Sequence, residues 1–280
     1  MLGQHRDAYA LPEVNLFAGE TILGILDELT GPRIHGLLRS LAQLTTGEQT
    51  MESVDTARRW LFRRMHSGTD EVYMEICRKV APLRIIDKST MYTDPGRPQC
   101  LERIRKAFPD AHFLHLVRHP RAQSEEWLKS PLALSQLFAL RSFERHSKQT
   151  VIDPQLDWRL RQQGIVTFLD GVPEDRQMRV RSEDILADPR HQLRTVCQWL
   201  GLKWSERIYR ALLHPERCSY SCPGPYGAEL GNAPAFLASP AFHREALSLR
   251  KELKRPLPWR PDSKSFLPEV VEMAQQFGYS

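Results

Sequence analysis

The sequence predicts an α/β fold in which helices flank a parallel sheet, and two observations support this class. Apolar runs of strand length alternate along the chain with amphipathic helical patterns, which is typical of parallel strands joined by helices. Three of these runs also end in polar or charged residues. Because the composition shows no break along the chain, we expect residues 1–280 to form a single domain.

The strands are expected at residues 83–86, 112–117 and 177–181. Lys88 follows the first strand, Arg118 follows the second and Ser182 follows the third. In a parallel sheet the carboxyl ends of the strands lie at one edge, and ligands bind in the crevice outside that edge. We therefore expect Lys88, Arg118 and Ser182 to face one cleft.

Helical periodicity predicts further elements between and after these strands, at residues 55–65, 69–80, 101–108, 188–200, 208–212 and 268–277. The clearest helix has Asp188 as its N-cap and Pro189 at its first position, and Gly201 is placed to end it. Gly278 is placed to end the last helix in the same way. Residues 215–261 are rich in Pro and Gly, so we expect much of this stretch to be irregular.

The composition is that of an ordinary globular protein, with 41% hydrophobic and 26% charged residues. A formal net charge of +5 fits an anionic ligand, a nucleotide or an acidic partner. No apolar run is long enough for a membrane helix, and residues 1–7 lack the basic stretch and apolar core of a secretory signal. We therefore expect a cytoplasmic protein that does not bind a membrane.

The five cysteines predict neither a disulfide framework nor a metal centre. Cys218 and Cys222 lie close to His214 in the sequence, but no fourth ligand stands at a suitable spacing. We expect these to be ordinary loop cysteines and the protein to bind no metal.

Two other classes of protein receive little support. The chain has no GxxxxGK[ST] motif and no carboxylate clearly placed for Mg²⁺, which disfavours a nucleotide kinase. Its basic residues are dispersed and interleaved with acidic ones, so we expect no nucleic-acid partner.

Lys88 and Arg118 carry the chemistry that a phosphorylated nucleotide needs. Lys88 offers a positive charge with three donors on a flexible stem, and Arg118 offers a rigid fork that matches phosphate. Charged residues also end strands simply because strands end at the surface. The two residues alone leave both interpretations open.

Four stretches, in this order along the chain, resemble segments of the sulfotransferase family. Residues 11–13 (LPE) resemble the "PPE" after the family's first helix, and residues 86–89 (IDKS) resemble a strand end of bacterial and polyketide-associated members. Residues 117–122 (VRHPRA) resemble the 3′-phosphate-binding segment. Residues 181–189, running into residues 199–202 (WLGL), are similar to the family's "YEDLv…P…FLGL" stretch.

The resemblance implies a P-loop-NTPase-like fold and an enzyme that moves a sulfuryl group from 3′-phosphoadenosine 5′-phosphosulfate (PAPS), its co-substrate, to a hydroxyl or an amine. Such a reaction follows the logic of phosphoryl transfer, with cations neutralising charge around the transferred group. On this basis Lys88 stabilises the leaving phosphate oxygen, Arg118 binds the 3′-phosphate and Glu13 is the general base. The alternative for Glu13 is a surface carboxylate beside a helix.

The chain departs from the family pattern at three places. Residues 1–5 match the end of the helix that follows the family's 5′-phosphosulfate loop, so we expect the first strand and this P-loop to be missing. Glu126 stands where the family usually has a Ser, and Ser124 is the nearest hydroxyl that could replace it. Ser182 stands where many relatives have a Tyr beside the adenine.

These departures leave a second class of function open, a non-catalytic sulfotransferase-like protein that acts by binding. Loss of a central strand would expose backbone groups and apolar side chains, so we also expect possible self-association. The acceptor is not predicted, and a small molecule, a sugar or a carrier-bound chain would each fit. Residues 218–243 are expected to cover the acceptor side, since variable loops usually set specificity.

Overall fold

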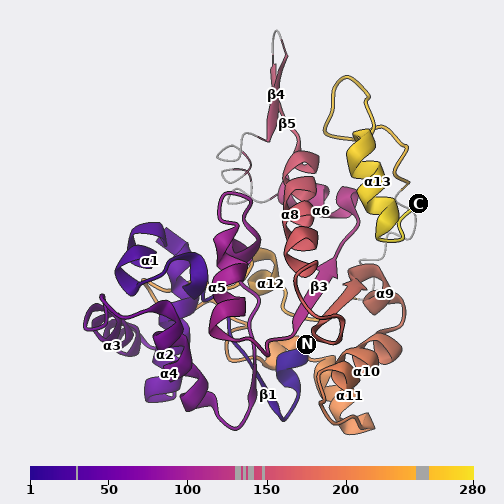
Figure 1. Cartoon of the computed structure of the whole chain (residues 1–280). Helices are drawn as coiled ribbons and strands as arrows, with labels where there is room; N and C mark the ends of the chain where they lie inside the picture. The colour runs from indigo at the N-terminus through magenta and orange to yellow at the C-terminus, as the bar shows by residue number, and fades with distance from the viewer. Residues whose placement is uncertain (30, 130–133, 135–136, 138–141, 147–148, 244–251) are drawn as a thin grey trace. The chain divides into compact units, whose positions relative to one another are not determined.

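The computed structural model describes all residues except 30, 130–133, 135–136, 138–141, 147–148 and 244–251, and the chain divides into two compact units (Figure 1). The first unit comprises Met1–Ala111 and Leu193–His243, and the second comprises His112–Gln192 and Arg244–Ser280. Both units combine helices with a pair of parallel strands, which confirms the α/β class. The expected single domain stays a prediction.

The first unit contains a short parallel sheet in which β1 (Ala8–Ala10) pairs with β2 (Arg84–Ile86). Its described α-helices are α1 (Ile22–Glu28), α2 (His35–Thr46), α3 (Met51–Phe62), α4 (Thr69–Val80), α5 (Gln99–Ala107), α11 (Glu206–Leu212) and α12 (Pro234–Ala238). Short 3-10 helices lie at η1 (Leu2–Gln4), η2 (Leu16–Ala18), η3 (Gly31–Ile34), η4 (Thr90–Thr93) and η6 (Pro215–Arg217). The predicted strand 83–86 is confirmed as β2, whereas β1 is too short to show an alternating pattern.

Helix boundaries in this unit follow local capping. The structure confirms the prediction of α4 residue for residue. Helix α3 begins four residues before its predicted start at residue 55, because Thr50 caps it. The Thr50 hydroxyl accepts from the Ser53 N–H at 3.2 Å, and the Ser53 hydroxyl accepts from the Thr50 N–H at 2.8 Å. This reciprocal pair satisfies backbone donors that would otherwise lack partners.

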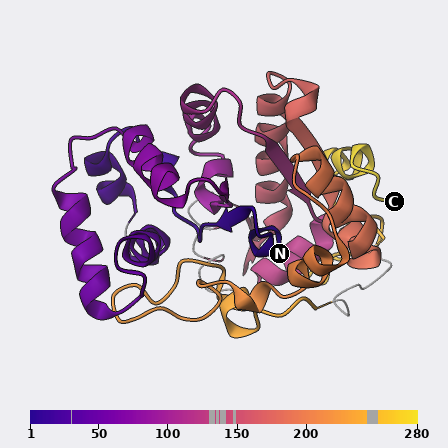
Figure 2. The same ribbon diagram turned by 90° about the horizontal axis from the view of Figure 1, so that it is seen from below.

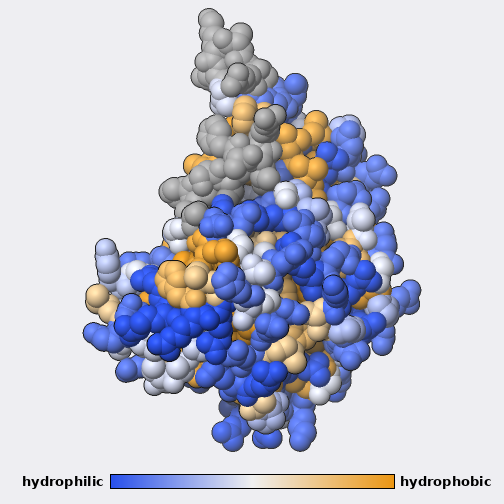
Figure 3. Space-filling view, turned by 60° about the vertical axis from the view of Figure 1, so that its left-hand side comes forward, coloured by the Kyte–Doolittle hydropathy of each residue, from blue (hydrophilic) through white to orange (hydrophobic). Residues whose placement is uncertain are grey.

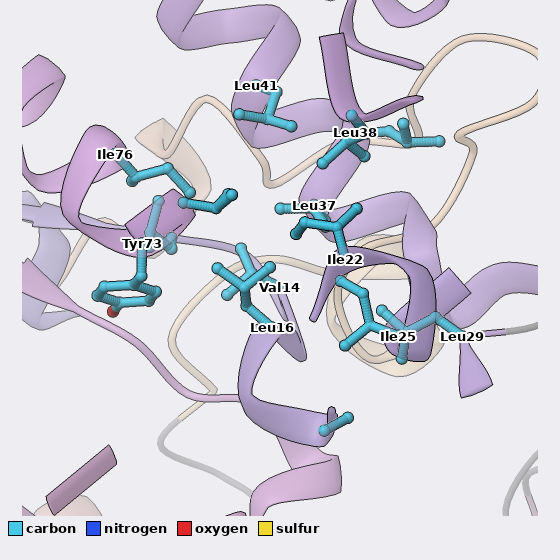
Figure 4. Packing of buried hydrophobic residues seen from close by; sticks show 14 of the residues in the cluster. Val14, Leu16, Ile22, Ile25, Leu29, Leu37, Leu38, Leu41, Tyr73 and Ile76 are labelled. Atoms are coloured by element: carbon cyan, nitrogen blue, oxygen red, sulfur yellow. The ribbon is translucent and has the colours of Figure 1, made fainter. Parts of the chain in front are cut away.

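Buried apolar side chains from several segments form the core of the first unit (Figure 4). The labelled members are Val14, Leu16, Ile22, Ile25, Leu29, Leu37, Leu38, Leu41, Tyr73 and Ile76. Fully burying one aliphatic side chain contributes about 1.5–3 kcal/mol. Leu11 and Val14 are both buried and stand on either side of Pro12 and Glu13, so core packing holds the backbone at residue 13.

The segment after η6 belongs to the first unit and runs along α2 and α3 (Figure 2). On α2, the buried Arg39 donates to the carbonyl of Leu230 at 2.8 Å. On α3, Arg58 donates to the carbonyl of Gly227 at 3.2 Å. Side-chain donors therefore satisfy backbone groups of an otherwise irregular stretch, which is how a Pro- and Gly-rich segment becomes ordered.

The second unit contains the parallel pair β3 (Phe113–Val117) and β6 (Gln177–Arg181) and the antiparallel pair β4 (Phe143–His146) and β5 (Gln149–Ile152). Its described helices are α6 (Pro120–Trp127), α8 (Pro154–Leu169), η5 (Glu174–Arg176), α9 (Ser182–Ala187) and α13 (Pro268–Gln276). Helix α10 (Pro189–Trp199) begins in this unit and ends in the first. In Figure 1, α8 and α13 lie side by side, and Trp158 of α8 packs against Phe277 with ring centroids 6.1 Å apart.

The glycine-terminated helices confirm their sequence signals. The Asp188 carboxylate accepts from the His191 N–H at 3.0 Å at the start of α10. Gly201 has φ 66° just after that helix, and Gly278 has φ 82° just after α13. Residues with a side chain rarely adopt this left-handed backbone conformation, so glycine ends both helices at little cost.

The expected sheet is divided between the units, because β2 pairs with β1 and β3 pairs with β6. The β3–β6 register sets Val117 opposite Arg181, so the residues that follow these two strands share an edge. A shared edge with Lys88 stays a prediction, and so does the missing first strand with its loop.

The face of the molecule in Figure 3 is largely hydrophilic, with apolar residues in separate groups. Across the part of the chain that the structure describes, no helix has the length and apolar character needed to cross a membrane.

Candidate functional site

Glu13 and Lys88 meet at the carboxyl edge of the β1–β2 pair in the first unit. Glu13 follows β1 and Lys88 follows β2, and the two strands are parallel. The Lys88 ammonium donates to one carboxylate oxygen of Glu13, and the Thr90 hydroxyl donates to the other at 2.9 Å. The Glu13 side chain is 15% exposed and that of Lys88 is 67% exposed. A shielded carboxylate therefore lies beside a cation that reaches into solvent.

Close backbone packing fixes the position of Glu13. Its N–H donates to the carbonyl of Gly231 at 2.6 Å, and the N–H of Leu11 donates to the carbonyl of Ile86 at 2.9 Å. At Gly36, near the start of α2, an added Cβ would stand 2.1 Å from the Glu13 carbonyl oxygen. Only glycine fits there, so α2 lies directly against the backbone that carries the carboxylate.

A polar network behind this pair links the two strand ends. Asp87 accepts from the Ser89 hydroxyl at 2.8 Å and from the Tyr92 hydroxyl at 3.0 Å. The Ser89 oxygen accepts from the N–H of Asn15 at 3.0 Å, and Asn15 has a left-handed φ of 52°. Asp87 as a residue is half-buried, but its carboxyl group is enclosed, and this desolvation raises its pKa to about 6. The network joins the segment of Glu13 to that of Lys88.

Arg118 and Ser182 lie at the edge shared by β3 and β6 in the second unit. The Ser182 hydroxyl donates to the carbonyl of Val117 at 3.0 Å, and Trp158 donates to the carbonyl of Arg118 at 3.2 Å. The Arg118 guanidinium forms an ion pair with Glu126, near the end of α6. Their side chains are 34% and 46% exposed, so both groups are within reach of solvent.

Two other polar residues of α6, Arg121 and Ser124, face inward. Ser124 is fully buried, and its hydroxyl has no hydrogen-bond partner among the described residues. Arg121 is also buried, and its guanidinium donates to three backbone carbonyls, those of Glu252, Arg255 and Pro256, at 3.2, 2.7 and 2.9 Å. Burial lowers the pKa of Arg121. Arg121 therefore anchors the segment before α13 to α6.

In the second unit, Glu183 links the strand ends to the last residues of the chain, and the sequence did not predict these contacts. Glu183 accepts from the N–H of His119 at 3.0 Å and from the hydroxyl of Tyr279 at 2.7 Å. Burial raises the pKa of Tyr279. Glu183 lies in a recognised motif, but its partner at the far end of the chain gives no sequence signal. Thr90 beside Glu13 was missed for the same reason, because 77 residues separate them.

The structure thus brings Glu13 and Lys88 together in the first unit, and Arg118 and Ser182 together in the second. Ser124 lies on the same helix as Glu126 but is enclosed. Among the residues that the structure describes, no group of three or more His, Cys, Asp or Glu side chains is arranged to hold a metal ion.

Comparisons with known proteins bear on the family and the fold of this chain. A family model described as the sulfotransferase family matches residues 1–206. A sulfotransferase domain from the curacin biosynthetic pathway has a similar fold, with a TM-score of 0.74 and 20% identity, and the match covers 100% of this chain and 91% of that one. A sulfotransferase domain from the Synechococcus PCC 7002 olefin synthase matches with a TM-score of 0.72 and 23% identity, over 100% of this chain and 88% of that one. No curated protein has a sequence that matches this chain. The family match spans well over half of the sequence, and the chain therefore belongs to the sulfotransferase family.

Proposed function

We propose that this chain is a transferase that moves a sulfuryl group from an adenine nucleotide donor of the PAPS type to a hydroxyl or an amine. The observation that carries the proposal is the contact between Lys88 and Glu13 at the carboxyl edge of β1 and β2. The reaction needs a cation near the leaving oxygen and a base near the acceptor proton. These two side chains supply both, and membership of the family supports the reaction type.

In the proposed step the acceptor oxygen or nitrogen attacks sulfur, and a new bond to sulfur forms as the bond from sulfur to the phosphate oxygen breaks. The electron pair of the broken bond stays on that phosphate oxygen, where the charge of Lys88 stabilises it. Glu13 takes the acceptor proton and later returns it to water. The products are the sulfated acceptor and the desulfated nucleotide.

Both side chains are suited to their proposed parts. Lys88 has a flexible stem and is 67% exposed. Its ammonium can therefore turn from Glu13 toward the donor without leaving solvent. Thr90 and the backbone contacts of residue 13 hold the carboxylate in place when Lys88 moves.

On the nucleotide side we propose Arg118 and Ser182 as contacts, because both lie at the open edge of the β3–β6 pair. The guanidinium of Arg118 is a donor fork suited to a phosphate or a ribose. Ser124 would join them only after a rearrangement of α6, since its hydroxyl is enclosed.

On the acceptor side we propose residues 218–243. Within this segment, Gly231 accepts a hydrogen bond from the backbone of Glu13, and Tyr220 bonds Tyr9 of β1 through their hydroxyls at 2.7 Å. The segment thus lies beside the proposed base. A small-molecule acceptor and a carrier-bound acceptor both fit this proposal.

One observation favours a second candidate, a sulfotransferase-like protein that binds without catalysis. The ion pair of Arg118 with Glu126 occupies the guanidinium that a 3′-phosphate would need. A binding protein of this kind would take up the nucleotide or the acceptor but would not transfer the sulfuryl group.

Transfer of radiolabelled sulfuryl from phosphosulfate donors to a panel of hydroxyl and amine acceptors distinguishes the two candidates. We expect labelled product with the wild type and a rate about 10²–10⁴-fold lower with Glu13→Gln. The matched control is Glu20→Gln, an exposed carboxylate of the same unit. A Glu13→Gln variant that keeps the wild-type rate would overturn the assignment of the base. Nucleotide binding without labelled product would favour the binding protein.

A further inference from the structure

We propose that Glu126 makes this chain select a donor with a free 3′-hydroxyl, adenosine 5′-phosphosulfate, over one that carries a 3′-phosphate. The proposal rests on the function proposed above, in which the nucleotide lies against Arg118. It concerns the chemical class of the donor, and the contacts that carry it all lie within the second unit.

The pairing of Arg118 with Glu126 is set by local structure. Arg118 directly follows β3, and Glu126 lies near the end of α6 (Pro120–Trp127), which starts two residues after Arg118. The carboxylate of Glu126 takes a hydrogen bond from the guanidinium of Arg118. A phosphate at this position would have to displace the carboxylate and then remain beside it.

No cation on α6 offsets the negative charge of Glu126. Arg121 is the one Lys or Arg of this helix, and it is buried with its guanidinium held by three backbone carbonyls. The hydroxyl of Ser124 is fully buried and faces no ligand position at the surface. Arg118 and Glu126 thus form an exposed pair of opposite charges after β3, and Arg181 and Asp184 form a second such pair at the end of β6. Neither pair carries a net charge that would attract a dianion.

Electrostatics then disfavours a phosphate at this edge. A phosphate monoester carries close to two negative charges at neutral pH, and a like charge within a few Å opposes its binding. At an effective dielectric constant near that of a protein surface, this repulsion corresponds to at least about a tenfold loss of affinity. The screening by salt is incomplete at such short distances.

A free ribose hydroxyl suits the same pair of side chains. A carboxylate accepts hydrogen bonds from hydroxyl groups, and a guanidinium donates to hydroxyl oxygens. Dinucleotide-binding folds use this contrast, because an acidic residue holds a free ribose hydroxyl and an Arg accommodates a ribose phosphate. Here Arg118 holds the carboxylate of Glu126 in position. Sulfuryl transfer from this donor forms and breaks the same bonds as the step described above, and the leaving group is adenosine 5′-phosphate.

The test measures binding of two product nucleotides, adenosine 5′-phosphate and adenosine 3′,5′-bisphosphate, to the whole chain by calorimetry. The variants are Glu126→Ser and, as a control with the same loss of charge in the same unit, Glu174→Gln at an exposed position of η5. We expect the wild type to bind adenosine 5′-phosphate at least as tightly as the bisphosphate. We expect Glu126→Ser to raise bisphosphate affinity about tenfold or more and Glu174→Gln to change neither affinity.

Each other outcome has a definite meaning. If the wild type prefers the bisphosphate about tenfold or more, or if Glu126→Ser leaves the preference unchanged, the inference about Glu126 is wrong and the proposed function stands. If neither nucleotide binds to the wild type or to Glu126→Ser, while melting curves show that both are folded, the proposed function fails as well.

Discussion

Lys88 donates a hydrogen bond to the carboxylate of Glu13 although 75 residues separate them, because each follows one strand of the parallel β1–β2 pair. The surrounding contacts fix the carboxylate rather than the ammonium. Glu13 is held by Thr90, by the carbonyl of Gly231 and by the packing of Gly36, whereas Lys88 extends into solvent. This asymmetry supports the parts proposed for them, a base that is held in place and a cation that can move.

The close approach of α2 to residue 13 predicts that Gly36→Ala damages both stability and transfer. An added Cβ would meet the Glu13 carbonyl oxygen at 2.1 Å, so the backbone must shift, at a cost of about 1–3 kcal/mol in unfolding free energy. Gly164→Ala is the matched control, because an added Cβ there meets nothing within 4 Å and the residue lies in helix α8. We expect the control to be more stable than the wild type by about 0.5–1 kcal/mol. Urea unfolding measures the unfolding free energy of both variants, and equal stability of the two would contradict the packing described.

His115 of β3 is predicted to remain neutral well below its ordinary pKa. Its Nε2 bonds the side-chain oxygen of Gln162 at 2.7 Å and therefore carries the proton, and its Nδ1 accepts from Arg179 at 3.1 Å. Burial lowers the pKa of His115 from 6.5 to about 4. Its contribution to stability is therefore fully present above pH 6.5 and is lost as the pH falls through 4, with a total of about 3 kcal/mol.

An NMR titration of the His115 ring measures its pKa directly. The pH dependence of the chain's total stability would not, because it also contains contributions of other groups that change in the opposite direction. The pKa of Asp87 is raised from 3.8 to about 6, so its contribution changes in the opposite direction as the pH falls from 6 to 3.8. We expect the His115 ring to titrate near pH 4. A midpoint near 6.5 would show that the ring is not enclosed as described.

Arg260 is predicted to be a large single contributor to the stability of the second unit. Its side chain is 2% exposed, and it pairs with Asp153, Glu144 and Asp262, the last two at 2.8 Å. Arg260→Met leaves Asp153 buried without its cation, which costs about 3–5 kcal/mol. Arg255→Met removes an exposed pair with Glu252 and should cost less than about 1 kcal/mol. Similar unfolding free energies for the two variants would count against this cluster.

Helices with strong local signals could be predicted from the sequence. The periodicity and charge of residues 69–80 predicted α4 correctly, and Gly201 and Gly278 marked the ends of two helices. Helix α8 was missed although Asp153 and Pro154 give the same start signal as Asp188 and Pro189. Its buried residues include Gln155, Asp157 and Gln162, so its inward face lacks a clear apolar stripe.

The candidate site could be predicted in part. Strand ends and family motifs pointed to Lys88 and Arg118, and the structure confirms that both follow strands. The sequence showed Glu126 where the family usually has a Ser, but the pairing of Glu126 with Arg118 depends on how α6 follows β3. The burial of Ser124 likewise depends on packing that no local pattern encodes.

The central claim is that Lys88 acts on the nucleotide donor, and calorimetry with adenosine 5′-phosphate tests it most directly. We predict binding to the wild type, an affinity about tenfold or more lower for Lys88→Ala, and no change for Lys79→Ala, which removes an exposed lysine of α4. Binding that is equal in Lys88→Ala and the wild type, or no binding of any adenine nucleotide to the folded wild type, would contradict the claim.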